Sequence, residues 1–338
     1  MNYSPKTKKK NKFDGYFTYG THYFNEITKR NAHVDSMSKK IKKYFIDPKT
    51  NLLYLHMSEA MICAVCGGKV HRTVFVKDGF THVKCCACGF IFVNPTAKDK
   101  YRDHFFGKLY RTWTKVLLTP EQESMDAGKF KYGLEFIEKH MPGKGLLVDI
   151  GAGSGLFLET AKNNGWDVSG IEFNSEAVKV IQKRKIKVFA KSLEDNIYAV
   201  NSVDVVTIWE VLEHINHPVA FIKQVRNILK PGGLLFICVP NINALVTRIL
   251  QEKSRTFGGS SHVNFFSIDT LSRLAKKNNF KVLETDNVIS ELGTIKNYLS
   301  YEDPYSGSAE LCLDFLTPEY LYKNNLGSRI FMLCRKIR

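Results

Sequence analysis

Through the second half of the chain, short apolar runs alternate with segments whose apolar positions have helical spacing. Residues 145–150, 167–171 and 203–209 are apolar runs with the length of buried strands. The first run is followed by residues 156–164, whose apolar positions have the spacing of an amphipathic helix. Residues 234–239 form another run of the same kind. Strands that alternate with helices predict a parallel sheet with helices on both faces.

The C-terminal third predicts two more strands and two long inserts. A helix is expected over residues 268–278, a strand over 280–285 and a last strand over 329–336. The segments 241–265 and 287–325 are too long for plain turns and are rich in Tyr, Asn, Ser and Gly. We expect both segments to lie over the carboxyl end of the sheet and to form an acceptor pocket there.

Composition places the chain among ordinary globular proteins. It has 338 residues, 44% of them hydrophobic and 24% charged, which is enough for a full core and about two domains. No run approaches the roughly 20 apolar residues that a membrane-spanning helix needs. The lysine-rich beginning also lacks the apolar segment of a secretory signal. A cytoplasmic protein without a membrane span is therefore expected.

The net charge of +16 is unevenly distributed along the chain. Residues 1–50 hold 12 Lys and Arg against 4 Asp and Glu, whereas residues 146–240 are neutral. Such a lysine-rich beginning predicts a basic N-terminal arm over residues 1–57, solvated and partly disordered. Binding of nucleic acid by this arm is the alternative. The neutral middle of the chain argues against nucleic acid as the favoured partner.

Five of the eight cysteines lie close together and form a repeated pattern. Cys63 and Cys66 occupy one C-x-x-C-G segment, and Cys85 and Cys88 occupy a second. In a reducing compartment, two such pairs predict a tetrahedral zinc site with four thiolate ligands. Cys86 breaks the spacing and is left out of the ligand set. Because no coordination position stays open, we expect a structural zinc in a zinc ribbon.

A glycine-rich loop joins the first predicted strand of the sheet to its helix. The loop Gly151–Gly155 has the pattern G-x-G-x-G, and Leu156 stands where a dinucleotide site has its third glycine. A carboxylate at Asp149 is poorly suited to a pyrophosphate but suits a ligand with a cationic amino-acid head. Glu172, at the end of the second strand, is placed to accept both ribose hydroxyls. These features favour S-adenosylmethionine (SAM) over a dinucleotide.

Five segments, in this order along the chain, resemble motifs of the class I SAM-dependent methyltransferases. They are residues 148–155, 170–174, 192–194, 203–214 and 229–240. The resemblance implies a doubly wound α/β fold with a seven-stranded Rossmann-like sheet, preceded here by the zinc ribbon. It also implies a set of cofactor-binding residues, in which the phenyl ring of Phe173 packs on adenine. That set comprises Asp149, Gly151, Ala152, Gly153, Gly155, Glu172, Phe173, Leu193, Glu194 and Trp209.

Two histidines and a glutamate are candidates for the chemistry. Methyl transfer is an in-line displacement at an activated methyl group, so the protein mainly has to align the acceptor. A hydroxyl acceptor must also lose its proton to a base. Either His214, which follows the fourth strand, or His262, in the first insert, could be that base. The alternatives are that His214 only orients its loop or contacts SAM, and that His262 caps a helix or is a core histidine. We expect Glu210, more than Glu213, to face the site.

The arrangement of a zinc ribbon in front of such a domain is similar to that of methyltransferases from surface-polysaccharide and sugar biosynthesis. This resemblance implies a small-molecule acceptor, a sugar or nucleotide sugar, with O-methylation favoured over C- or N-methylation. The alternatives are an RNA methyltransferase that uses the ribbon and arm to bind RNA, and an inactive SAM- and zinc-binding module. The oligomeric state stays open. The expected domains are the arm (1–57), the ribbon (58–97), a helical linker or lid (98–143) and the methyltransferase domain (144–338).

Overall fold

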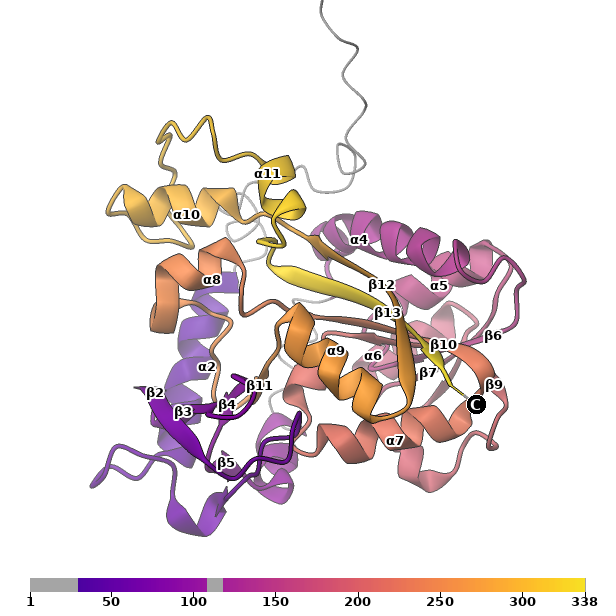
Figure 1. Cartoon of the computed structure of the whole chain (residues 1–338), viewed down its shortest axis with the longest axis horizontal. Coiled ribbons are helices and arrows are strands. Elements are labelled where there is room, and N and C mark those ends of the chain that lie inside the picture. The colour runs from indigo at the N-terminus through magenta and orange to yellow at the C-terminus, as the bar shows by residue number, and fades with distance from the viewer. Residues whose placement is uncertain (1–29, 108–117, 338) are drawn as a thin grey trace, which may run out of the picture.

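The centre of the molecule is a seven-stranded sheet with the order β12-β13-β10-β9-β6-β7-β8 (Figure 1). The computed structural model describes residues 30–107 and 118–337. All neighbouring pairs from β10 to β8 are parallel, and β13 lies antiparallel between β10 and β12. The predicted doubly wound α/β sheet is therefore confirmed. Its strands are β6 (Leu146–Ile150), β7 (Asp167–Ile171), β8 (Lys187–Phe189), β9 (Val203–Trp209), β10 (Leu229–Pro240), β12 (Phe280–Val288) and β13 (Arg329–Lys336).

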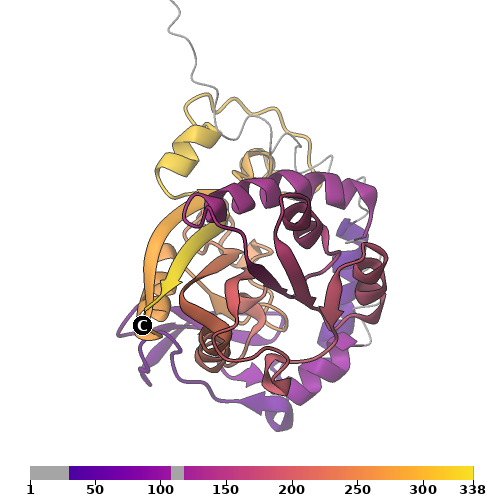
Figure 2. The same cartoon turned by 90° about the vertical axis from the view of Figure 1, so that its right-hand side faces the viewer.

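Helices cover both faces of this sheet because β10 sends alternate side chains to opposite sides. Leu234 and Phe236 pack with α4, α5 and α6, whereas Leu235 and Ile237 pack with α7 and α9. In Figures 1 and 2 the long helix α4 lies along one side of the sheet. The helices are α4 (Pro120–Glu138), α5 (Leu156–Asn163), α6 (Ser175–Lys183), α7 (Pro218–Ile228) and α9 (Ile268–Lys277).

A second, smaller sheet carries the cysteine pairs. Within the expected zinc ribbon, two strands on either side of the turn at Asp78 and Gly79 pair antiparallel. The order of this sheet is β11-β4-β3-β2, so its fourth strand comes from the first insert, far along the chain. The strands are β2 (His71–Lys77), β3 (Phe80–Cys85), β4 (Ile91–Val93) and β11 (Asn264–Phe265), beside a separate pair, β1 (Ser58–Glu59) and β5 (Thr96–Ala97).

Residues 30–57 differ from the predicted solvated arm. Helix α2 (Arg30–Phe45) begins this segment, and the 3-10 helix η1 (Leu55–Met57) ends it. Phe45 is fully buried and packs edge-on against Phe80 of the small sheet. The lysine-rich composition hid this because, among residues 34–45 of α2, Phe45 is buried and Met37, Ile41 and Tyr44 are only partly buried. The rest of the predicted arm, residues 1–29, lies outside the described residues.

The two predicted inserts contribute short helices that pack on one another. Val246 and Leu250 of the first insert share a buried cluster with Ile295, Leu316 and Leu321 of the second. None of the helices in the described ranges is long and apolar enough to cross a membrane. The short helices are α8 (Leu245–Leu250), η4 (Gln251–Lys253), α10 (Leu292–Leu299) and α11 (Pro318–Lys323), and η2 (Leu193–Asp195) and η3 (Leu212–His214) lie earlier in the chain.

Candidate active site

The glycine loop between β6 and α5 has a backbone that only glycine adopts easily. The φ angles of Gly151, Gly153 and Gly155 are 78°, 54° and 76°. A Cβ on Gly151 would lie 2.5 Å from Val211 Cγ2, and one on Gly155 would lie 2.8 Å from Ile181 Cγ1. The loop therefore packs tightly against the protein on one side, and its N–H groups at Gly151 and Ala152 donate to the Ile171 carbonyl at the end of β7.

Two buried carboxylates flank this loop. Glu172 accepts hydrogen bonds from the N–H groups of Gly153 (2.8 Å) and Asn174 (2.7 Å). Asp149 accepts a 2.7 Å hydrogen bond from the Thr207 hydroxyl. Burial raises the pKa of Asp149 to about 7, and the nearby charge of Glu172 adds to the effect. Burial also raises the pKa of Glu172, although backbone N–H groups that donate to its carboxylate stabilise the charge and reduce this rise. A cationic or hydroxyl-bearing ligand would satisfy both groups.

The other predicted cofactor residues occupy different environments. The Phe173 ring is 70% exposed beside Glu172, whereas Ala152 and Leu193 are buried. Glu194 is exposed and accepts a 2.9 Å hydrogen bond from Gln224. An exposed phenyl ring at the end of β7 is free to stack on a flat heterocycle. The contacts of these residues with a cofactor stay predictions.

Trp209 lies in the aromatic core beneath the site. Its ring packs against Phe130, Phe157 and Phe236, with centroids 4.7–5.0 Å apart. A Cβ on Gly133 of α4 would lie 2.3 Å from the indole, so the helix approaches it very closely. This packing supports the end of β9, and the predicted role of Trp209 in binding the cofactor stays untested.

Glu210 follows β9 in a left-handed conformation, with φ at 53°. Its side chain forms an ion pair with Arg329 of β13 and lies 4.0 Å from Lys129 Nζ of α4. Arg329 is also 3.7 Å from Glu291. The residue predicted to face the site thus belongs to a charge network that ties β9 to β13.

Glu213, which sequence reasoning placed second, is the carboxylate that lies with the two histidines. One side-chain ligand atom of each of Glu213, His214 and His262 lies within 4.8 Å of the others. The two imidazole centroids are 4.7 Å apart. No periodicity signals this arrangement, because the single turn of η3 sets the direction of Glu213. The structure therefore brings together both predicted histidines with the glutamate that the sequence analysis did not favour.

Electrostatics keep this cluster close to neutral. Burial lowers the pKa of His214 to about 3, and the neighbouring His262 lowers it further. Burial also lowers the pKa of His262. Burial raises the pKa of Glu213 to about 8, and the nearby charge of Glu210 adds to this rise. Neutral imidazoles can accept a proton or bind a cation through a ring nitrogen.

Arg102 is a functional candidate that sequence reasoning missed. Its buried guanidinium donates to the carbonyl oxygens of His214 (2.6 Å), Ser261 (3.1 Å) and Ser260 (3.2 Å). It also donates to Asn216 Oδ1 at 2.8 Å. Arg102 lies in helical residues 99–107 of the predicted linker, and the next ten residues lie outside the described part of the chain. One side chain thus holds together the backbones that carry both histidines.

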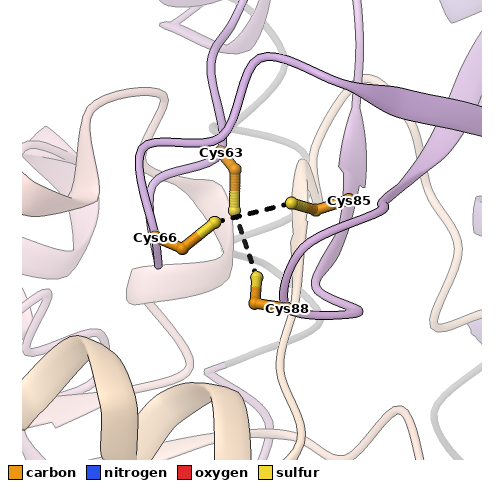
Figure 3. A group of neighbouring side chains, drawn as sticks. All are labelled: Cys63, Cys66, Cys85 and Cys88. Carbon is orange, nitrogen blue, oxygen red and sulfur yellow. Dashed lines mark hydrogen bonds between the residues drawn. The ribbon is translucent and has the colours of Figure 1, made fainter.

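The four predicted cysteine ligands converge, as Figure 3 shows. Their sulfur atoms all lie within 4.8 Å of one another, with 3.5 Å between Cys63 and Cys88 and between Cys66 and Cys85. A tetrahedral zinc site with Zn–S bonds of about 2.3 Å has sulfurs about 3.8 Å apart, so the geometry fits zinc. Cys86, left out of the predicted set, is exposed and outside this group.

The two cysteine turns are built alike. Gly67 N–H donates to the Cys63 carbonyl (2.8 Å), and Gly89 N–H donates to the Cys85 carbonyl (2.9 Å). Both glycines have positive φ angles, 82° and 75°. Burial opposes ionisation of Cys85, but hydrogen bonds from the backbone of Cys88 and Ala87 outweigh it and lower its pKa to about 7. This turn therefore favours the thiolate at Cys85, whereas burial raises the pKa of Cys63 and of Cys88.

The cysteine-bearing sheet is joined directly to the histidine cluster. Its strand β11 begins two residues after His262. Between them, Val263 donates its N–H to the Glu213 carbonyl (2.8 Å) and accepts from Val93 N–H (2.9 Å). Asn264 of β11 donates to the Ile215 carbonyl at 2.7 Å. The position of His262 thus depends on the small sheet as well as on the large one.

Comparison with known proteins identifies the class. The family model described as "Methyltransferase domain" matches residues 122–285, which contain the glycine loop and the end of β9. Together with the sheet order, this match shows that the chain contains a class I SAM-dependent methyltransferase domain, as predicted.

Relatives of this domain include two groups of curated proteins. The chain is 27% identical over 167 residues to an uncharacterized protein of Methanocaldococcus jannaschii, covering 49% of this chain and 79% of that protein. It is 32% identical over 123 residues to the ubiquinone biosynthesis O-methyltransferase of Nitrosospira multiformis, covering 32% of this chain and 49% of the relative. The chain thus spans about half the length of such O-methyltransferases.

Solved structures with a similar arrangement include two methyltransferases. One is a possible histamine N-methyltransferase from Thermotoga maritima, 18% identical with a TM-score of 0.45, covering 69% of this chain and 99% of the other. Another is the 1,6-didemethyltoxoflavin-N1-methyltransferase of Burkholderia thailandensis, 12% identical with a TM-score of 0.48, covering 79% and 100%.

Proposed function

We propose that the protein transfers a methyl group from SAM to a hydroxyl oxygen of a small molecule, a sugar or nucleotide sugar. The observation that carries this proposal is the arrangement at the carboxyl end of the sheet. The glycine loop follows β6, which contains Asp149, and Glu172 follows β7. Glu213 and His214 follow the adjacent strand β9 and lie together with His262 of the first insert. A cofactor site next to an acid–base cluster is what methyl transfer to a hydroxyl requires.

The chain's own residues account for each part of SAM. The Glu172 carboxylate would accept the ribose hydroxyls, and Asp149 would attract the cationic amino-acid end. The exposed ring of Phe173 would pack on adenine. The glycine loop would let the ligand approach the backbone closely, because no Cβ stands there.

The transfer itself needs alignment and removal of one proton. The acceptor oxygen forms a bond to the methyl carbon while the carbon–sulfur bond breaks, which leaves S-adenosylhomocysteine. The hydroxyl proton passes to a base, for which we favour the imidazole of His214 or His262. Nδ1 of each ring lies 2.9 Å from a backbone carbonyl oxygen, so each Nε2 keeps the lone pair that would accept the proton. The O-methyltransferase relatives support oxygen as the methylated atom.

We further propose that Cys63, Cys66, Cys85 and Cys88 hold one structural zinc ion. Four thiolates fill a tetrahedral shell, so the ion would have no open position for a substrate. Its role would be to hold the small sheet whose strand β11 carries the segment after His262. Loss of zinc should therefore lower turnover more than it lowers SAM binding.

A methyl-transfer screen tests the function. The full chain would be incubated with SAM labelled on the methyl group and with nucleotide sugars, phenols or RNA as acceptors. Label on a nucleotide sugar, lost in Asp149→Asn, is the expected result. Label on RNA, lost when residues 1–29 are removed, would instead establish the RNA methyltransferase. SAM binding by calorimetry without transfer to any acceptor would establish the inactive module.

A further inference from the structure

The second insert carries an exposed surface that is both acidic and apolar. In Figures 1 and 2 its helices α10 and α11 project beyond the large sheet. Residues 299–320, which we call the acidic segment, contain five acidic residues and no basic one, although the whole chain has a net charge of +16. All five acidic residues are exposed, namely Glu302, Asp303, Glu310, Asp314 and Glu319.

Large apolar side chains stand among these acidic groups. Tyr301 is fully exposed and Phe315 is 74% exposed. Glu310 and Asp314 form no ion pair within the part of the chain that the structure describes. Exposed apolar groups that are concentrated in one segment and bordered by polar ones mark a surface for another protein. Three further residues of the segment are exposed and apolar, namely Leu299, Leu311 and Tyr320.

Helix α2 carries the opposite charge. Its apolar residues pack towards the small sheet, with Phe45 buried and Met37 and Ile41 partly buried. Four exposed lysines, which we call the lysine face, make no ion pair with any described residue. They are Lys39, Lys40, Lys42 and Lys43.

The lysine face and the acidic segment lie close to each other. Arg255 of the first insert stacks on the ring of Tyr305 at 3.9 Å, and its N–H donates to the Tyr305 hydroxyl at 2.7 Å. Burial lowers the pKa of Arg255, whereas nearby acidic groups, among them Asp303 of the acidic segment and Asp35 of α2, oppose this effect. Arg255 therefore stands between α2 and the acidic segment. One side of the molecule thus has an acidic part next to a basic part.

We propose that this side of the molecule binds a second copy of the chain, with the acidic segment of each copy against the lysine face of the other. A surface whose adjacent halves have opposite charge is self-complementary, because a two-fold rotation brings each half opposite the other. Ion pairs between exposed groups contribute little each. The apolar side chains would therefore supply most of the affinity, and the charges would set the register of the two copies.

The contact would also reach the candidate active site, a consequence that rests on the function proposed above. Arg255, which binds Tyr305 of the acidic segment, precedes Thr256 in the chain. The Thr256 carbonyl oxygen lies 2.9 Å from Nδ1 of His262. The second copy would thus support the segment that positions His262, whereas Glu172 is held by the N–H groups of other segments. Separating the copies should lower turnover and leave the affinity for SAM unchanged.

Charge reversal tests the interface by sedimentation equilibrium of the nuclease-treated full chain. The wild type should have the mass of two chains, and added salt should weaken the association. Glu310→Lys/Asp314→Lys and Lys39→Glu/Lys43→Glu should each lower the affinity at least about tenfold, because each places like charges opposite one another. Lys179→Glu/Lys183→Glu is the matched control, because these exposed lysines have the same spacing on α6 and should leave association unchanged.

Mixing the two weakened variants is the decisive measurement. In a mixed dimer every reversed surface faces one of opposite charge, so the affinity should return to within about threefold of the wild-type value. SAM affinity within about threefold of wild type shows that each variant is folded. A monomeric wild type, or a loss that mixing does not repair, would overturn the interface. A mass that grows beyond two chains would overturn the two-fold arrangement.

Methyl transfer separates this interface from the proposed function. If the dimer is confirmed and no acceptor is methylated, the interface stands and the proposed transfer fails. If the monomeric variants methylate an acceptor at the wild-type rate, the link from the interface to His262 is wrong.

Discussion

Arg102 should be the single most important side chain for holding the two histidines in place. Substitution by alanine removes four hydrogen bonds from a charged donor, three of them to backbone carbonyls. At about 1 kcal/mol net for each bond, the loss amounts to about 4 kcal/mol. A further pair with Asp99, at 3.7 Å and half-exposed, adds little. We expect Arg102→Ala to lower the free energy of unfolding by about 3–5 kcal/mol.

Lysine at this position should recover part of that stability. Its ammonium keeps the charge and has three donors, but it lacks the planar fork that reaches four acceptors at once. Arg102→Lys should therefore lose about 2 kcal/mol. Urea unfolding followed by tryptophan fluorescence would measure both values. Arg273→Ala is the matched control, because its pair with Asp269 is more than half exposed and should change stability by less than about 0.5 kcal/mol.

Function gives a second readout on the same variant. The backbones that Arg102 holds carry His214 or adjoin His262, whereas Glu172 is held by the N–H groups of Gly153 and Asn174. Turnover of Arg102→Lys should fall at least tenfold while its affinity for SAM stays within about threefold. A stability change below about 1 kcal/mol in the alanine variant would refute the energetic reasoning. Equal losses of SAM affinity and turnover would refute the positioning role.

Three further predictions concern the cofactor and the cysteines. Gly151→Ala should weaken SAM binding more than tenfold in calorimetry, because the added Cβ would lie 2.5 Å from Val211 Cγ2. Gly165→Ala is the control for backbone strain alone, because Gly165 also has a positive φ (89°) but an added Cβ there would meet no atom within 4 Å. Burial raises the pKa of Asp149 to about 7, so its carboxylate becomes protonated and SAM affinity should fall as pH falls below about 7. Asp149→Asn should bind SAM weakly at every pH, and an unchanged pH profile would contradict this role. Cys66→Ser should lose most of the zinc measured by mass spectrometry, whereas Cys86→Ser should keep it.

The ribbon is the clearest case in which sequence and structure contribute different parts. The two C-x-x-C-G turns are local, so their spacing predicted four converging sulfurs without any knowledge of the fold. The fourth strand of that sheet, β11, comes from a segment about 170 residues later and has only two residues. So short a strand has no periodicity to detect. Its pairing follows from how the large domain places the insert.

The sequence by itself predicted six strands of the α/β sheet, the glycine loop and the two cysteine turns, whereas the seventh strand, β8, followed only from the resemblance to known methyltransferases. These features depend on residues close together in the chain, whose apolar spacing and backbone freedom can be inferred locally. Only the tertiary structure decided that Glu213, not Glu210, joins the histidines and that Arg102 holds their loops. It also decided that residues 30–57 pack against the small sheet. The reason is physical: these choices depend on contacts between distant segments, and local patterns carry no information about which buried groups meet.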